Sequence, residues 1–240
     1  MMLNFRQLQT LQLRSINILP LLLLVCSTMV FAQSDTTKVD SLAKKSYIPT
    51  GIRIGTDMLS IARSMYSSKT FTGWEVNADV DFDRYYLAVD YGYWARTFDG
   101  DKSSYDNNGT YFRVGPDVNF LTKDPEKNMF FFGLRYGHAT FSEHLKIENV
   151  QDPVWGSLDT QVANVNINGN WFELVTGLKV KMWKFIWMGY TARFKFGLST
   201  NETGLMKPSD VPGYGSTDKQ STWGFNYQLF FRIPAPIKHK

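Results

Sequence analysis

Hydrophobic and polar side chains alternate with a period of two through most of the chain beyond residue 50. Residues 129–141, MFFFGLRYGHATF, show this order clearly, since Phe130 and Phe132 share one face while Gly133 and Arg135 share the other. Successive side chains of a β-strand point to opposite faces, so the order predicts a strand that separates two different media. Read as a helix, the same residues would form no apolar stripe.

Eight segments carry this alternation, and nothing between them resembles an α-helix, which disfavours a fold of alternating strands and helices. The predicted strands are 51–63, 72–82, 85–97, 110–121, 129–141, 170–182, 185–198 and 222–233. Short connections take turns with long ones: 83–84, 122–128 and 183–184 are short, and 97–109, 142–169 and 199–221 are long. Long loops gathered at one end are typical of outer-membrane barrels. The pattern therefore predicts an all-β fold, an eight-stranded antiparallel up-and-down transmembrane β-barrel with short periplasmic turns and long extracellular loops.

The connection at 142–169 contains apolar residues such as Val154, Trp155 and Val165. Two interpretations stay open for it. These residues extend the hairpin beyond the membrane and leave a strand edge for a partner, or they cover the mouth of the barrel.

Side-chain size indicates which face of the sheet is inside. A water-soluble β-barrel or sandwich would show the same alternation, but a small closed barrel has little interior room, which favours small residues inside. The glycines, including Gly133 and Gly137, share the parity of the charged residues, whereas most Phe, Tyr and Trp side chains share the other. The rings are therefore expected to face lipid, with Tyr and Trp near the strand ends at the membrane interfaces.

The polar parity then forms a charged lumen of seven acidic and eight basic residues. The acids are Asp57, Glu75, Asp79, Asp81, Asp90, Asp117 and Glu173, and the bases are Arg53, Arg113, Arg135, Lys179, Lys181, Arg193, Lys195 and Arg232. Near-equal numbers allow a paired network, whereas isolated buried charges would each cost several kcal/mol. We interpret the network as a structural filling, not as a conduit or a catalytic set, because diffusion pores need about 16 strands.

The N-terminus resembles a secretory signal peptide with cleavage after Ala32, because a basic start precedes a short apolar run and small residues. A signal-anchor and a lipoprotein acylated on Cys26 are the alternatives. The expected organisation is a signal peptide at 1–32, a flexible periplasmic leader at 33–49, the barrel at 50–236 and a short basic tail at 237–240. Cleavage would remove the single cysteine, so neither disulfides nor a thiolate metal site are expected.

The balance of basic and acidic residues does not indicate nucleic-acid binding. The chain has 26 basic and 22 acidic residues, and cleavage after Ala32 would remove Arg6 and Arg14. The remaining charges are nearly balanced and interleaved, without a basic patch. No phosphate-binding glycine loop or zinc-ligand spacing is present, so no cofactor or metal is expected.

Residues 51–233 resemble small outer-membrane β-barrels of the OmpA/OmpX type, and the final strand, TWGFNYQLFFRI, looks like the aromatic-ended signal of the barrel-assembly machinery. It differs in that RIPAPIKHK follows Phe231. The export signal ending in VFAQ and the polar leader are similar to Bacteroidota proteins, including domain-of-unknown-function family 6048. The resemblance implies a Gram-negative outer membrane, with lipid, lipopolysaccharide and the assembly machinery as partners.

Three functions are compatible with these features. The first is a non-enzymatic membrane protein whose long external loops contact envelope partners or surfaces. The second is a subunit of a larger outer-membrane export or assembly complex. The third is a lipid A hydrolase, because His138 and Thr140 share the lipid-facing parity, Ser142 follows, and a base beside a hydroxyl is the arrangement of a nucleophile-base pair.

Overall fold

The computed structural model describes residues 49–121, 123–152, 154, 156–201 and 206–234. The expected signal peptide, nearly all of the leader and the basic tail lie outside these residues, as does Trp155.

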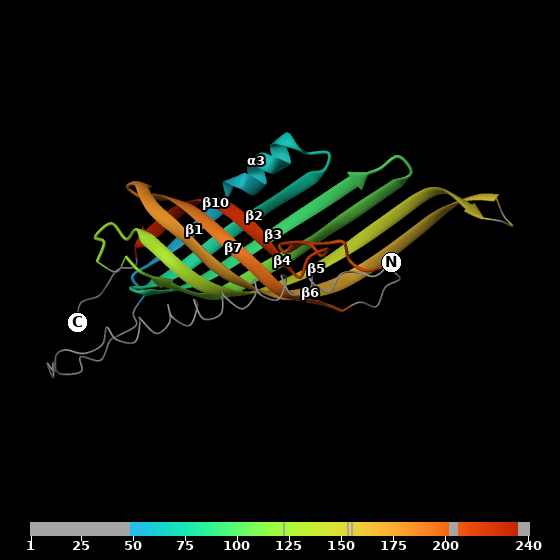
Figure 1. The fold of residues 1–240 in the computed structure, drawn as a ribbon. Helices are drawn as coiled ribbons and strands as arrows, with labels where there is room; N and C mark the ends of the chain where they lie inside the picture. Colours follow the sequence, from blue (N-terminus) through green and yellow to red (C-terminus); the bar gives the residue numbers. More distant parts are fainter. Residues whose placement is uncertain (1–48, 122, 153, 155, 202–205, 235–240) are drawn as a thin grey trace, which may run out of the picture. The chain divides into compact units, whose positions relative to one another are not determined.

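Eight strands form a closed antiparallel barrel, which is drawn in Figure 1. They are β1 (Gly51–Asp57), β2 (Phe71–Phe82), β3 (Tyr85–Asp99), β4 (Ser103–Asn119), β5 (Met129–Asp152), β6 (Gly156–Trp183), β7 (Ile186–Thr200) and β10 (Ser221–Pro234). Each strand pairs with its neighbour along the chain, and β1 pairs with β10 to close the ring. The prediction of an eight-stranded up-and-down barrel is confirmed.

The two ends of the barrel differ. At one end, called here the turn end, the connections 83–84, 120–128 and 184–185 join the strands. At the other end, called the loop end, lie helix α3 (Met58–Tyr66) and a long β7–β10 connection that contains the short strands β8 (Asp210–Val211) and β9 (Gly215–Ser216).

Burial alternates along the strands with the polar side chains inside. In β2, for example, Glu75, Asn77 and Asp79 are each at most 2% exposed, whereas the intervening Trp74 and Val76 are more than 40% exposed. This is the reverse of a water-soluble protein, in which charged residues are almost never fully buried. The barrel therefore has an apolar outer wall and a charged interior.

The interior also holds large rings, which the expectation of small interior residues did not include. Trp171 and Phe131 are each 1% exposed and lie inside the barrel. A Cβ added at Gly137 would fall on the indole of Trp171, and one added at Gly177 would meet the ring of Phe131. These glycines make room for rings as well as for charged groups, so the interior is filled by both kinds of side chain.

A helix follows β1, so the predictions of a strand over 51–63 and of no helix between the strands are wrong. Strand β1 ends at Asp57, and α3 begins at the next residue. The Asp57 carboxylate accepts from the backbone N–H groups of Leu59 and Ser60, both at 3.3 Å. An N-cap of this kind satisfies donors that the first helical turn leaves free, and it ends the extended conformation at this residue.

Most of the extra length at the loop end is built as strand. Strands β3 and β4 continue until only Gly100–Lys102 separates them. Strands β5 and β6 stay paired as far as Asp152 and Gly156, so the interpretation of 142–169 as an extended hairpin is the one that the structure shows. The mouth is covered instead by the β7–β10 connection, whose Val211 and Tyr214 are buried in a cluster with Trp171.

Gly137→Ala is expected to lower the free energy of unfolding by about 1–3 kcal/mol, the usual cost of overpacking a filled interior. The Trp171 indole cannot move freely because its Nε1 donates to Glu173 at 2.8 Å. Urea unfolding of the barrel in detergent micelles measures the change. Gly169→Ala is the control, because its Cβ would come no closer than 3.2 Å to any atom. Equal stabilities of the two variants would contradict the prediction.

Candidate functional site

One layer of paired charges lies toward the turn end and centres on Asp79. Its Oδ1 accepts from Nε of Arg53 at 2.7 Å, and its Oδ2 accepts from Nζ of Lys179 at 2.8 Å. The cations also face rings: Arg53 lies 4.7 Å from the ring centre of Tyr86, and Lys179 lies 4.6 Å from that of Phe230. One carboxylate thus holds two cations, and aromatic faces help to compensate the additional charge.

Two simpler pairs lie in the same half of the barrel. Arg135 donates from Nη2 to Asp117 at 2.7 Å, and its Nη1 also donates to the Gly115 carbonyl at 3.1 Å. Arg232 donates from Nη2 to Asp81 at 2.7 Å. Arg135, which lies in a strand rich in aromatic residues, therefore has a carboxylate and a backbone carbonyl as partners.

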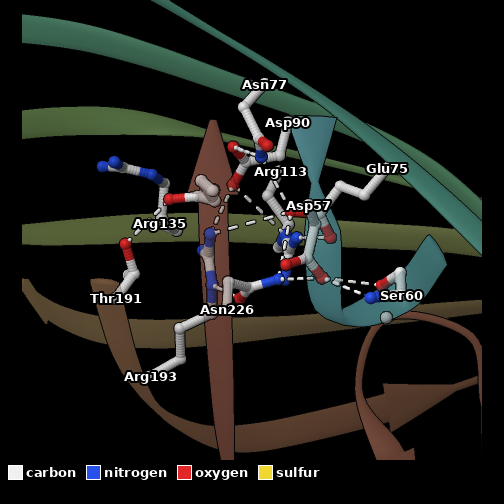
Figure 2. A network of polar contacts seen from close by, with 12 residues as sticks. Asp57, Ser60, Glu75, Asn77, Asp90, Arg113, Arg135, Thr191, Arg193 and Asn226 are labelled. Atoms are coloured by element: carbon white, nitrogen blue, oxygen red, sulfur yellow. Dashed lines mark hydrogen bonds and ion pairs between the residues drawn. The ribbon is translucent and has the colours of Figure 1, made fainter. Parts of the chain in front are cut away.

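Three acids and two guanidinium groups form a central cluster inside the barrel. Figure 2 shows Glu75, Asp90, Arg113 and Arg193 of this cluster. Arg113 donates to Glu75, and its Nε lies 3.4 Å from Oδ2 of Asp90. Arg193 lies 3.0 Å from Asp90 through Nη2 and 3.1 Å from Glu173 through Nη1. Each of the three acids lies within 4.0 Å of both guanidinium groups, so the cluster is a single network rather than a set of separate pairs.

Neutral side chains complete the cluster, and sequence reasoning missed them. The Tyr111 hydroxyl donates to Glu75 at 2.6 Å, and Asn77 donates to both Glu75 and Asp90 at 2.7 Å. They share the parity of the charged residues, which is the signal that identifies them. A search restricted to charges omits these groups, although a buried ion pair needs them to satisfy its remaining lone pairs.

The interior has little free space between these layers. The cavity bounded by Asp79, Asp90 and Arg193 has a volume of about 10 Å³. That is close to the smallest space that holds one water molecule. Side chains therefore fill this part of the barrel, and the geometry offers no aqueous path along its axis there.

Asp57 serves as a junction and makes no ion pair among the described residues. Besides capping α3 through Leu59 and Ser60, its carboxylate accepts from Nδ2 of Asn226 and from the backbone N–H of Tyr227, both at 3.0 Å. Figure 2 shows Asp57 between Ser60 and Asn226. One buried side chain thus joins the end of β1, the start of the helix and the facing strand β10.

The mouth at the loop end is held by two charged contacts. Lys195 donates from Nζ to the carbonyls of Gly213 and Tyr214, at 2.6 and 3.0 Å. Arg96 donates to Asp210 at 2.9 Å. Burial raises the pKa of Asp210 to about 6, against the opposing effect of Arg96. The contact of Asp210 is therefore sensitive to pH near the acid end of the physiological range.

The predicted charged residues fall into two groups. Most are buried inside the barrel; they are Arg53, Asp57, Glu75, Asp79, Asp81, Asp90, Arg113, Asp117, Arg135, Glu173, Lys179, Arg193 and Lys195. The other two lie at the turn end: the Arg232 side chain is 10% exposed and that of Lys181 is 29% exposed, beside Glu126.

His138 and Thr140 lie together on the outer face, as their parity indicates. Thr140 Oγ1 is 3.5 Å from Nε2 of His138 and donates to Asn168 at 2.9 Å. The Nδ1 of His138 lies 2.7 Å from Oδ1 of Asn170. Ser142 accepts from a backbone N–H across the hairpin. The orienting partner of the histidine is thus an amide, and the threonine hydroxyl is directed to Asn168.

In the described part of the chain, no three His, Cys, Asp or Glu side chains are placed to hold a metal ion. None of the helices among these residues has both the length and the apolar character needed to cross a bilayer.

Comparison with known proteins gives one family and several similar folds. The model of the family "Domain of unknown function (DUF6048)" matches residues 13–239, which confirms the resemblance to that family. No curated protein matches. Among solved structures, CarO of Acinetobacter baumannii is 13% identical, with a TM-score of 0.37 over 78% of this chain and 98% of CarO.

Two more solved structures are similar. Neisserial surface protein A (NspA) is 10% identical, with a TM-score of 0.34 over 79% of this chain and 98% of NspA. CarO2 of Acinetobacter baumannii is 12% identical, with a TM-score of 0.36 over 79% of this chain and all (100%) of CarO2.

Asp79→Asn is expected to lower the free energy of unfolding by about 3–5 kcal/mol, because it leaves the buried Arg53 and Lys179 without their shared counter-charge. Urea titration of the folded barrel in micelles measures the loss. Glu148→Gln is the matched control, since it removes an acid from the exposed Lys146–Glu148 pair and should leave the midpoint unchanged. If both variants unfold at the wild-type midpoint, the interior network does not stabilise the barrel.

The docking of residues 206–217 should weaken as pH rises from about 4 to about 6. The pKa of Asp210 in the folded protein is about 6, above the ordinary value of about 3.9. The docked state therefore binds the proton more tightly, and the resulting stabilisation is present below about pH 4 and lost through about pH 6. Hydrogen exchange of this segment, corrected for intrinsic rates, measures the effect. Asp210→Asn should abolish the pH dependence, whereas the exposed Asp218→Asn should retain it.

Proposed function

We propose that this chain, which belongs to the family described as "Domain of unknown function (DUF6048)", is a non-enzymatic integral β-barrel of a bacterial outer membrane. In this proposal the barrel is a stable anchor, and its loop end contacts partners at the cell envelope. The wall contacts membrane lipid, the loop end lies among lipopolysaccharide, and the chain is inserted by the barrel-assembly machinery after export.

The apolar outer wall is the observation that carries the proposal. Large hydrophobic side chains are exposed on every strand of the barrel, among them Ile54, Trp74, Val89, Phe112, Phe132, Leu174, Tyr190 and Phe225. An apolar surface that surrounds a whole domain far exceeds the few hundred Å² found on monomeric soluble proteins. Lipid accommodates such a surface, and a closed barrel leaves no unpaired strand edge within most of the wall.

The filled interior supports a structural role for the barrel instead of a transport role. The charged side chains pair with one another, and the cavity beside Asp79 and Asp90 measures about 10 Å³. A conduit would need a continuous polar path, which larger barrels provide with more strands. Function in this proposal therefore belongs to the loop end.

The β5–β6 hairpin is the part of the loop end best suited to a protein partner. Strand β6 begins to pair with β7 at Gly169, and the backbone of Asn168 bonds Asn201, so between Gly156 and Ile167 the pairing of β6 in the described chain is with β5. A strand edge of this kind accepts an added strand from another chain. The same edge suits a subunit of a larger export or assembly complex, and recovery of the free barrel alone in a mild-detergent pulldown would count against that alternative.

The geometry around His138 favours a non-catalytic role for this group. Thr140 lies 3.5 Å from the ring nitrogen, which exceeds the usual distance of a nucleophile from its base, and its hydroxyl donates to Asn168 instead. Among the described residues, no carboxylate is a hydrogen-bond partner of His138. An interfacial histidine bonded to Asn170 is consistent with a polar contact at the edge of the apolar wall.

Two arginine substitutions test the membrane location. Leu174 and Val165 are both exposed, by 54% and 62%, but Leu174 lies in the barrel wall and Val165 lies in the extended hairpin. If the wall is embedded in lipid, Leu174→Arg should destabilise the folded barrel by about 2–4 kcal/mol, while Val165→Arg should have little effect. Unfolding of the barrel in lipid vesicles measures both.

The wild-type protein should be found in the outer-membrane fraction and should change its gel mobility on heating. A water-soluble barrel would tolerate both arginines, since each would point into solvent. Tolerance of Leu174→Arg, together with a protein that remains soluble without detergent, would overturn the proposal.

A further inference from the structure

The wall of the barrel is interrupted at the loop end because β1 is short. Strand β1 pairs with β10 between the turn end of the barrel and Asp57, which lies opposite Gln228. On its other side, β1 pairs with β2 only as far as Val76. Beyond these points, β10 from Ser221 to Tyr227 has β7 as its only strand neighbour in the described chain. The two edges that β1 would have joined are therefore left apart.

Helix α3 closes only one side of this interruption. The Ser64 hydroxyl donates to the Gly73 carbonyl and accepts from the Gly73 N–H, each at 2.7 Å, so the helix satisfies the edge of β2. The corresponding anchor on β10 is the contact of Asp57 with Tyr227. In the described chain no hydrogen bond joins α3 to β10 beyond that point, and a slot remains between them.

A cavity of about 500 Å³ passes through this slot. Its lining includes Gly224 and Asn226, which face the interior, and also Trp223 and Phe225, which face outward. The lining thus includes consecutive residues of β10 beside its unpaired edge. The cavity therefore follows the edge at which the wall of the barrel is interrupted.

The inner part of the cavity is positively charged. Arg63 of α3 and Arg96 of β3 both line it, and their guanidinium carbons lie 4.3 and 5.8 Å from the centre of the Phe71 ring. Arg63 makes no ion pair within the described residues. Burial, and next the neighbouring Arg96, lower the pKa of Arg63. Arg96 is already paired with Asp210 at 2.9 Å. An anion beside the two arginines would therefore add a second counter-charge and further relieve their mutual repulsion.

Two hydrogen-bond donors that line the cavity lack acceptors. Nε of Arg96 and Nε1 of Trp94 are buried, and neither has a hydrogen-bond partner among the described atoms. The acids of the lining are already occupied: Glu75 accepts from Arg113 and Tyr111, and Asp57 caps α3. The side chains of Arg96 and Trp94 would have to turn to bring these donors to an anion in the cavity, and Arg63, which is exposed, offers the charge-assisted contact without such a movement.

We propose that the slot binds a single-chain amphiphile with an anionic head. The head, a carboxylate or a phosphate, is held by Arg63 and Arg96 in the cavity. The aliphatic chain leaves past the edge of β10 and lies against Trp223 and Phe225 on the outer wall. This adds a small-molecule site to the anchoring role proposed above. It differs from a site for a small soluble anion, which would use the arginines alone.

Equilibrium binding of radiolabelled dodecanoate tests the site, with the full chain in zwitterionic lipid nanodiscs and protein-free nanodiscs as background. We expect dodecanoate to bind saturably and with higher affinity than dodecanol. Acetate should not displace it. Arg63→Gln should weaken it by about tenfold, the loss of one charge-assisted contact. Arg84→Gln is the control, because Arg84 is also exposed but lies in the β2–β3 turn.

A second pair of variants tests the path of the chain. Phe225 and Phe231 both face outward from β10 and are equally exposed, at 54%, but only Phe225 lines the cavity. Phe225→Ala should weaken dodecanoate binding, and Phe231→Ala should not.

Equal binding of dodecanol and dodecanoate, efficient displacement by acetate, or unchanged affinity in Arg63→Gln would each overturn the site. Such a result with a membrane-inserted barrel would not contradict the proposed membrane location, because insertion is measured independently by the change in gel mobility on heating.

Discussion

The pairing of charges inside the barrel is the constraint on which the other features depend. A small barrel with an apolar exterior must place its polar groups inside, where an unpaired charge costs several kcal/mol. Glu75, Asp90 and Glu173 come from three strands and converge on Arg113 and Arg193. A strand that slipped by one residue would bring rings inside and charges into the wall. The network therefore stabilises the register of the sheet as well as filling it.

The same constraint explains how the loop end is built. The interior must be closed above the network, and the β7–β10 connection does this by burying Val211 and Tyr214 against the rings of Trp171 and Tyr111. Lys195 fastens that connection through backbone carbonyls. The base of the β5–β6 hairpin takes part in this closure, because Ile167 belongs to the same cluster and Asn164 donates to the Met206 carbonyl at 2.6 Å. The part of the hairpin beyond these residues is the part suited to use as a contact surface.

The strands and their faces were predictable from sequence because a period of two is a local signal. The interior charges followed from parity, whereas their partners did not, because Asp79 with Lys179 joins positions distant in sequence. Helix α3 was missed although its sequence carries a signal, since the apolar pairs Met58–Leu59, Ile61–Ala62 and Met65–Tyr66 recur at helical spacing after the capping residue Asp57. The slot was unpredictable because it arises where a strand ends too early to reach both of its neighbours, which depends on the three-dimensional pairing of the strands.

The short first strand also has a consequence for the mechanics of the fold. The ring is closed by β1 alone, and its contact with β10 extends over Gly51–Asp57, whereas β5 and β6 are paired along most of their length. Local opening of a protein begins where the fewest interactions must break together. On its other side β1 pairs with β2 over Gly51–Thr56. The two contacts of β1 are therefore the places where the ring would separate first under load.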